Sequence, residues 1–171
     1  ELKNIFVRNA VKEAVPGTGG YSTTKMSTPD YLTGNYTGSS GTVAYLANSV
    51  TPPVSVGIEH KTDYWFYILP NEEATRTALV LEGTFKKSAS DAGTTIYYPI
   101  IVNKSQTGTN ITGASGTGTS NIARNTTYAI KATIKNIGTD DPTGEINPTS
   151  LELTVSVADW ALNITQDVTF E

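Results

Sequence analysis

Apolar and polar residues alternate most regularly in two segments of the second half of the chain. In 128–134 every even position is apolar, and positions 131, 133 and 135 carry Lys, Thr and Lys. In 151–157 the apolar residues instead occupy the odd positions, with Glu, Thr and Ser between them. A period of two places one set of side chains on each face of a strand. The pattern predicts two half-buried β-strands, which we expect to pair in one antiparallel sheet.

Other segments are apolar at both odd and even positions, which is typical of strands covered on both faces. They are Tyr64–Leu69, Ala78–Phe85 and Ile96–Val102. Pro99 lies inside the last of these, which predicts an edge strand or a bulge there because proline cannot donate a ladder hydrogen bond. The first residues, 2–7, form a further strand. With the chain end, the count is about seven strands, which indicates an all-β, antiparallel β-sandwich.

Long stretches rich in Thr, Gly, Ser and Tyr separate the predicted strands. They are Pro16–Thr42 and Asn103–Ser120, and stretches of this length are often functional loops. Within the second, Thr112–Ser120 is low in complexity and is predicted to be a flexible surface loop. The segment Gly138–Pro148 has turn-forming residues throughout.

The apolar positions change parity near the end of the chain. From Trp160 onward they are even-numbered, with only Gln166 breaking the series, whereas in Leu151–Val157 they are odd-numbered. A one-residue shift turns side chains to the opposite face, so we expect a bulge or a bend at Ala158 and Asp159. We therefore divide the chain into a sandwich, 1–159, and a C-terminal extension strand, 160–171. The apolar residues of this extension are Trp160, Leu162, Ile164, Val168 and Phe170.

Composition supports the β assignment and narrows the partners. The 171 residues include 28 Thr, 13 Ser and 15 Gly, which favour strands and turns over helices. The net charge of −4 argues against a nucleic-acid or anionic-membrane partner. There is no Cys, and no apolar run approaches the roughly 18 residues of a membrane span. Because a strand begins almost at residue 1, we expect the chain to be a piece of a larger precursor.

Residues that carry enzyme chemistry are scarce. His60 is the single histidine, and no nucleophile, phosphate-binding or zinc motif surrounds it. The neighbouring pairs Glu72-Glu73 and Asp140-Asp141 suit turns better than a glycosidase dyad. Asp140, Asp141 and Glu145 leave a calcium-binding turn open as an alternative, although their spacing does not match an EF-hand. We expect no catalytic residues, no metal site and no cofactor.

Several tyrosines lie in the first long loop. Tyr31 and Tyr36 are candidates for stacking against a sugar, which would make the chain a binding module instead of a purely structural one. More often such rings pin a loop to a sandwich and leave the hydroxyl in water. Both interpretations stay open at this point.

A set of segments resembles the C-terminal part of the FimA-like fimbrillins, which are the subunits of type V pili of Bacteroidales. The resemblance is clearest in RNTTYAIKATIKNIGTDDP (Arg124–Pro142) and LELTVSVADWALNITQDVTF (Leu151–Phe170), above all in the V-A-D-W step before the last strand. Upstream segments that are also similar are IFVRNA (Ile5–Ala10), YWFYILPN (Tyr64–Asn71), LVLEGTFK (Leu79–Lys86) and YYPIIVN (Tyr97–Asn103).

The resemblance implies a transthyretin-like second domain of a two-domain pilin. Such a pilin is made as an outer-membrane lipoprotein precursor, exported to cell-surface fimbriae and trimmed by an arginine-specific protease. Removal of an N-terminal strand then opens a groove, which the C-terminal strand of a neighbouring subunit fills. This donor role carries over to Trp160–Phe170. The implied partners are other pilin subunits, in a homopolymer with accessory and anchor pilins. Host glycans or proteins would be partners of the alternative, a tip adhesin or carbohydrate-binding sandwich. The sequence alone does not locate the acceptor groove.

Overall fold

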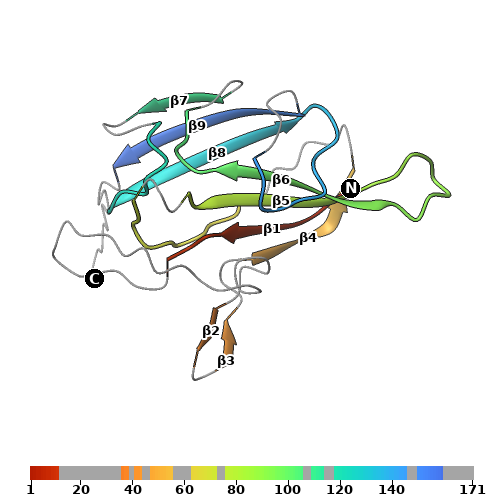
Figure 1. Ribbon diagram of the computed structural model, residues 1–171, viewed down its shortest axis with the longest axis horizontal. Coiled ribbons are helices and arrows are strands. Elements are labelled where there is room, and N and C mark those ends of the chain that lie inside the picture. Colours follow the sequence, from red (N-terminus) through yellow and green to blue (C-terminus); the bar gives the residue numbers. More distant parts are fainter. Residues whose placement is uncertain are drawn as a thin grey trace, which may run out of the picture.

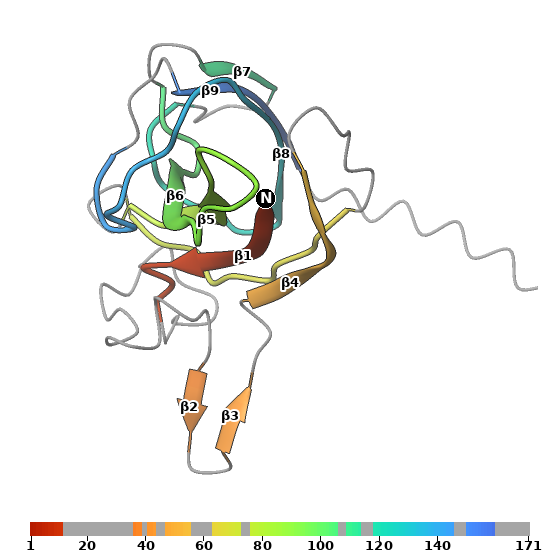
Figure 2. The same cartoon turned by 90° about the vertical axis from the view of Figure 1, so that its right-hand side faces the viewer.

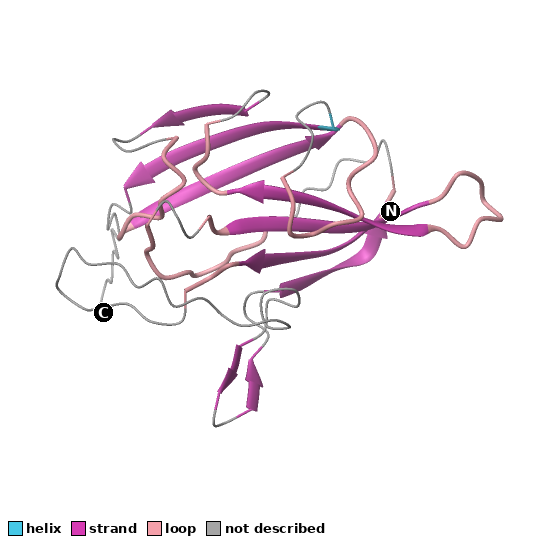
Figure 3. Cartoon of the chain, in the orientation of Figure 1, coloured by secondary structure: helices cyan, strands magenta, loops and turns pink. Residues whose placement is uncertain are grey.

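The computed structural model of the chain consists of two β-sheets that pack face to face (Figure 1). The structure describes residues 1–11, 36–38, 41–43, 47–55, 63–72, 76–105, 109–113, 118–145 and 150–159. Over these ranges strands and loops account for nearly every residue, and helix is limited to one short turn at Ser150 (Figure 3). Within them, no helix is long and apolar enough to cross a lipid bilayer.

The larger sheet has four strands in the order β4-β1-β5-β6. Each strand is antiparallel to its neighbours. The strands are β1 (Leu2–Arg8), β4 (Ala47–Val54), β5 (Ala78–Phe85) and β6 (Thr94–Ile101). The register between β1 and β4 shifts between Leu2 and Asn4, whereas β5 and β6 pair regularly over their full length.

The smaller sheet has three strands in the order β7-β9-β8. They are β7 (Thr109–Gly113), β8 (Thr126–Ile134) and β9 (Leu151–Asp159). Strand β9 pairs antiparallel with β8 and parallel with β7. The end-on view in Figure 2 shows this sheet arching over the larger one. A separate hairpin, β2 (Tyr36–Gly38) and β3 (Gly41–Val43), lies apart from both sheets.

The predicted all-β sandwich is therefore confirmed, and in the described residues its two sheets contain seven strands, five of which were predicted. The strands predicted at the chain start, at 78–85, at 96–102, at 128–134 and at 151–157 correspond to β1, β5, β6, β8 and β9. The antiparallel pairing of the last two is also confirmed. Strands β4 and β7 were not predicted, and β7 lies inside the stretch that the sequence assigned to a loop.

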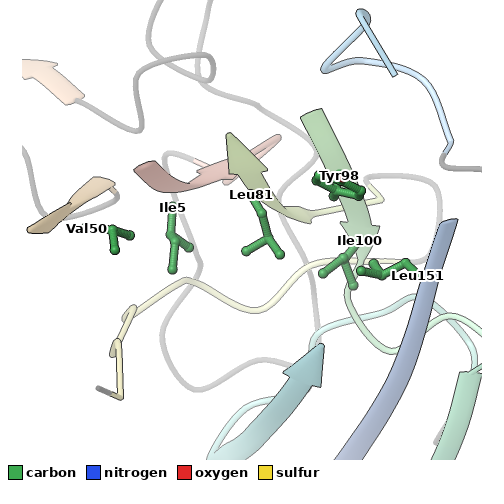
Figure 4. Packing of buried hydrophobic residues seen from close by; sticks show 6 residues of the cluster. All are labelled: Ile5, Val50, Leu81, Tyr98, Ile100 and Leu151. Carbon is green, nitrogen blue, oxygen red and sulfur yellow. The ribbon is translucent and has the colours of Figure 1, made fainter. Parts of the chain in front are cut away.

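The main core lies between the sheets and draws side chains from both of them. Its buried members are Ile5, Val50, Leu81, Tyr98, Ile100 and Leu151 (Figure 4). The opposite face of the larger sheet is buried as well, since Phe6, Ala78 and Val80 form a second cluster there. The prediction that 78–85 is covered on both faces is therefore correct, because each parity of this strand faces one cluster.

Pro99 shows how the larger sheet ends. Strand β6 is its last strand, as the proline predicted. Tyr97, two residues earlier, exchanges backbone hydrogen bonds with Thr139, on the side away from β5. Residues two apart in a strand direct their main-chain groups to the same edge, so the nitrogen of Pro99 also faces outward. The ladder with β5 therefore loses no hydrogen bond.

The segment Tyr64–Leu69, predicted as a strand covered on both faces, is not a strand. Its side chains alternate instead: Tyr64 and Phe66 pack against the main core, while the other row faces solvent. In the described part of the chain, the bridge between Asn71 and Ile122 is the first β contact that follows it. The prediction was wrong because apolar residues of both parities suggested two covered faces, whereas here one apolar row is exposed.

Candidate functional site

The end of β9 leads into the predicted extension strand. Leu151, Val155 and Val157 of β9 are buried, at 2%, 1% and 5% exposure. The odd-numbered row is thus part of the sandwich, as the alternation predicted. The predicted donor residues Trp160, Leu162, Ile164, Val168 and Phe170 lie outside the described residues.

Ala158 and Asp159 continue the regular pairing of β9. Ala158 stands opposite Thr127 and Asp159 opposite Thr126, with no shift of register along β8. No bulge is therefore found in the pairing of these two residues with β8, and they are the last two residues of the strand. The change of side-chain parity predicted after them falls outside the described residues and stays a prediction.

The free edge of the smaller sheet is β8, whose other neighbour is β9. The N–H of Lys135, next after the strand, donates to the carbonyl oxygen of Ser150 at 3.0 Å. In an antiparallel pair the residues that bond across alternate along the strand. Odd-numbered residues of β8 therefore bond to β9, and the main-chain groups of Ile130, Ala132 and Ile134 point toward the other edge. Among the described residues no strand pairs with that edge.

The apolar row of β8 is only partly covered. Tyr128, Ile130 and Ala132 are half-buried, although Ile130 and Ala132 pack against the main core. Ile134, at the end of the same row, is 42% exposed. On the neighbouring strand β9, Leu151, Val155 and Val157 are buried. Among the described residues, no strand therefore covers the side of the sandwich next to β8.

The segment 63–70 presents a second apolar surface. Its outward side chains are Trp65, Tyr67 and Leu69, with exposures of 68%, 75% and 38%. They are three of the five large apolar residues exposed in the described ranges. Large exposed apolar groups that gather in one place mark contact surfaces more often than isolated ones do. Sequence reasoning missed this surface because it assigned the row to the interior.

Of the two tyrosines proposed as ligand contacts, Tyr31 and Tyr36, only Tyr36 lies within the described residues. Tyr36 begins β2 and stands opposite Val43 of β3, and its side chain is not described. Tyr31 lies outside the described residues. A sugar-stacking role for these two tyrosines stays a prediction.

The acidic residues considered for calcium have other partners. Asp141 accepts hydrogen bonds from the N–H and the hydroxyl of Thr143, and these bonds lower the pKa of its carboxyl. Glu145 accepts from Lys104 at 2.7 Å and from Arg76 at 3.0 Å, which lowers its pKa too, Lys104 having the larger effect. Within the described part of the chain, no three acidic or histidine side chains are grouped to hold a metal ion. Asp141 therefore stabilises a turn, and Glu145 belongs to a surface ion-pair network with Lys104 and Arg76.

The remaining candidates for catalysis are His60 and the pair Glu72-Glu73. His60 and Glu73 lie outside the described residues, and Glu72 follows directly after the bridge residue Asn71. In the described part of the chain, the geometry offers two features suited to contact with other polypeptides: the edge of β8 that no described strand covers, and the exposed row of segment 63–70.

Comparison with known proteins agrees with a contact function. The model of the FimA4 pilin C-terminal domain matches residues 83–160. The fold is similar to that of a fimbrilin, FimA, from Porphyromonas gingivalis W83, with a TM-score of 0.55 and 22% identity over 92% of this chain and 50% of that one. It is also similar to a candidate cell adhesion protein from Parabacteroides distasonis ATCC 8503, with a TM-score of 0.50 and 20% identity over 94% of this chain and 52% of that one. No curated protein sequence matches the chain significantly.

The chain spans about half the length of either solved structure. The matched residues begin inside β5, include β6 to β9 complete, and end at Trp160, one residue past β9. They therefore contain the open edge of β8 and the start of the extension. The resemblance seen in the sequence is confirmed: residues 83–160 match the model of the FimA4 pilin C-terminal domain.

Proposed function

We propose that the chain is part of a structural subunit of a cell-surface fimbria, which polymerises when the C-terminal strand of one subunit inserts into a groove of the next. The family match carries this proposal. The division into a sandwich, 1–159, and a donor strand, 160–171, is part of it. So is the hinge role of Ala158 and Asp159, which lie where the regular pairing with β8 ends.

The chemistry of the terminal segment supports a donor role. Strand addition uses main-chain hydrogen bonds for affinity and alternate side chains for register. Burial of each of the five apolar side chains contributes roughly 1.5 to 3 kcal/mol, which gives a gross stabilisation of about 10 kcal/mol. This is of the size needed to exceed the cost of ordering the strand. A tail that enters a groove elsewhere on the next molecule is a heterologous contact, which propagates into filaments.

The proposed partners follow from this assembly. They are further copies of the same subunit, with accessory and anchor pilins at the ends of the fimbria. The proposed location is outside the outer membrane, in a fimbria assembled from a lipoprotein precursor. No cofactor or catalytic step takes part.

Electron microscopy of the full-length mature protein tests the donor role. Leu162→Asp places a charge in the groove without a partner, which is strongly unfavourable, so the variant is expected to form no filaments. The control is Asn163→Asp, which alters the neighbouring polar position of the opposite parity and should leave filaments intact. The melting temperature of monomeric Leu162→Asp should stay within about 2 °C of the wild type.

Two results would disprove this assignment. If Leu162→Asp still forms normal filaments, the terminal segment is not the donor. If its monomer unfolds, Leu162 belongs to the core of its own domain.

A second candidate function is ligand contact at the fimbrial surface or tip. The exposed rings of Trp65 and Tyr67 favour it, because aromatic faces stack against sugars and protein ligands alike. Binding on a glycan array that disappears in Trp65→Ala would support the adhesin alternative. Loss in Tyr31→Ala or Tyr36→Ala instead would assign the contact to the Tyr-rich loop.

A further inference from the structure

The exposed face of segment 63–70 carries a polar group as well as apolar ones. From residue 63 to residue 69, exposed and half-buried side chains alternate strictly, which is the pattern of an extended chain with one face outward. The exposed side chains are Asp63, Trp65, Tyr67 and Leu69, which we call the outward row. A carboxylate therefore stands at the start of the face that presents the two aromatic rings.

The dimensions of the outward row suit a small ligand. Residues two apart in an extended chain are separated by about 7 Å, so Asp63 and Tyr67 are about 13 Å apart. Trp65 lies midway between them. This is the length of a short oligosaccharide.

The exposed area distinguishes a small ligand from a protein partner. Trp65 and Tyr67 are 68% and 75% exposed. An aromatic side chain buries about 150 to 250 Å² when it is fully covered, so the two leave roughly 300 Å² open. Each partner of a stable protein–protein interface contributes about 800 Å². The outward row is therefore too small to hold another folded protein by itself.

The outward row is held in place from behind. Tyr64 and Phe66 pack against the main core, and Ile68 packs against a further buried cluster. Just after the segment, the backbone of Asn71 exchanges hydrogen bonds with that of Ile122 at 3.0 and 3.1 Å. A fixed backbone reduces the entropy that is lost when a ligand binds. The two rings are therefore presented in advance, as in a preformed binding site.

The charge of the row selects among saccharides. Asp63 is the single charged residue of segment 63–70, and the chain as a whole has a net charge of −4. An ionised carboxylate accepts hydrogen bonds from hydroxyl groups and donates none. It repels sialic acids and sulfated sugars, because these are negatively charged at neutral pH. An uncharged sugar with neighbouring hydroxyl groups is therefore the favoured class.

We infer that the outward row is a binding site for an uncharged oligosaccharide. The rings of Trp65 and Tyr67 stack against the C–H faces of sugar rings, and the carboxylate of Asp63 accepts hydrogen bonds from sugar hydroxyl groups. This inference rests on ligand contact at the fimbrial surface, the second candidate function, and it names the chemical class of that ligand.

The test is a glycan array probed with the labelled 171-residue chain. The array carries neutral oligosaccharides, lactose among them, together with their sialylated and sulfated forms. We expect the chain to bind at least one neutral glycan and to bind its sialylated form more weakly. Calorimetric titration of the tightest neutral glycan then gives a dissociation constant for the wild type and for each variant.

The variants separate stacking from hydrogen bonding. Trp65→Ala and Tyr67→Ala each remove one stacking surface, and each should weaken binding at least about tenfold. Tyr67→Phe retains the ring and should weaken binding less than Tyr67→Ala does. Asp63→Asn removes the negative charge, so it should reduce the preference for the neutral glycan over its sialylated form.

The control is Ile137→Ala, which truncates another large apolar side chain, 51% exposed, outside the outward row. It should change the dissociation constant by less than about twofold. All the altered side chains are exposed, so the circular dichroism spectra of the variants should match that of the wild type.

Several results would overturn the inference. One is an array on which no neutral glycan binds, and another is a wild-type chain that prefers the sialylated form. A third is binding that persists unchanged in both Trp65→Ala and Tyr67→Ala, which would place the sugar elsewhere. A dimer in sedimentation velocity that Trp65→Ala dissociates would show that the row is a protein contact instead.

Failure of this inference is distinguishable from failure of the proposed fimbrial function. Without saccharide binding, filaments that depend on Leu162 would still identify the chain as part of a fimbrial subunit. Conversely, filaments that survive Leu162→Asp would disprove the donor role, whatever the array shows.

Discussion

Ile130 of β8 stands directly opposite Val155 of β9, yet the two side chains differ sharply in burial. Val155 is 1% exposed, whereas Ile130 is half-buried. The two residues form a non-hydrogen-bonded pair of the antiparallel ladder, and in such pairs the side chains lie closest together. The difference therefore comes from the outer side of β8, where no described strand covers Ile130.

This difference predicts an inverted order of mutational effects. Val155→Ala is expected to lower the free energy of unfolding by about 2 kcal/mol, because a fully buried side chain loses contacts on every side. Ile130→Ala removes more atoms but should cost less, about 1 kcal/mol, because part of the side chain is already in water. Urea unfolding of the isolated chain measures both values. An Ile130→Ala variant that loses more stability than Val155→Ala in the isolated chain would contradict the open edge.

Much of the sandwich could be predicted because side-chain periodicity reports local burial. Strands β8 and β9 alternate cleanly, and β5 is apolar at both parities because clusters lie on both of its faces. Strand β4 escaped detection because Asn48, Pro52 and Pro53 lower its strand propensity. Strand β7 escaped because its Thr- and Gly-rich sequence is typical of loops, and its position depends on parallel pairing with β9.

The candidate site could be predicted only in part. The alternation of 128–134 predicts which face of β8 is apolar, but not which edge stays without a neighbour, since that depends on the order of strands in the sheet. The exposure of Trp65 and Tyr67 could not be predicted either, because an apolar residue carries the same sequence signal in a core and on a contact surface. One signal does distinguish the edges of the sheets: the edge strands β4 and β6 contain prolines, whereas β8 contains none.

A second prediction concerns Asn103, which is 1% exposed and joins the end of β6 to the loop before β8. Its side chain donates to the carbonyl oxygen of Asn121 at 3.0 Å and accepts from the N–H of Gly118 at 2.9 Å. Its φ of 58° is in the left-handed region, which asparagine tolerates better than alanine. Asn103→Ala should therefore cost about 2 to 4 kcal/mol, from unsatisfied buried groups and backbone strain together.

Asn125 provides the matched control for this prediction. Its φ of 50° is similar, but its side chain is exposed. Asn125→Ala should therefore cost about 1 kcal/mol, from the backbone alone. Equal losses in the two variants, measured by thermal unfolding, would mean that the buried hydrogen bonds of Asn103 contribute nothing measurable.

A third prediction concerns alkaline pH. The hydroxyl of Tyr98 donates to the carbonyl oxygen of Asn136 at 2.9 Å. Burial raises the pKa of this phenol. A backbone hydrogen bond from Gly138 lowers the same pKa, but its effect is smaller than that of burial. A folded-state pKa above the unfolded value of about 10 means that the neutral phenol stabilises the fold fully below about pH 10. That contribution is lost as the pH rises through the folded-state pKa.

Tyr98→Phe should separate the two contributions. At pH 7 it should cost about 1 kcal/mol, because the carbonyl of Asn136 loses its donor. Between about pH 10 and 12 its stability should fall less steeply than that of the wild type, since one titrating phenol is gone. A residual slope remains, because burial and Glu82 raise the pKa of Tyr97 as well. Parallel curves over this range would show that Tyr98 titrates alike in both states.

The last prediction tests whether β6 is closed to strand addition. Pro99 is among the fully buried residues, and its nitrogen faces the side where Tyr97 bonds to Thr139. Pro99→Val would add an N–H at that edge, in a place that solvent does not reach. An unpaired buried donor costs about 1 to 3 kcal/mol, so the variant should unfold at lower urea concentration than the wild type.

The control is Pro53→Val on β4, where the proline is exposed. Because water can satisfy the new donor there, the free energy of unfolding should change by less than about 0.5 kcal/mol. If Pro99→Val is as stable as the wild type, the outer side of β6 must admit water or another acceptor. The edge of β6 would then be blocked only by its proline and not by burial.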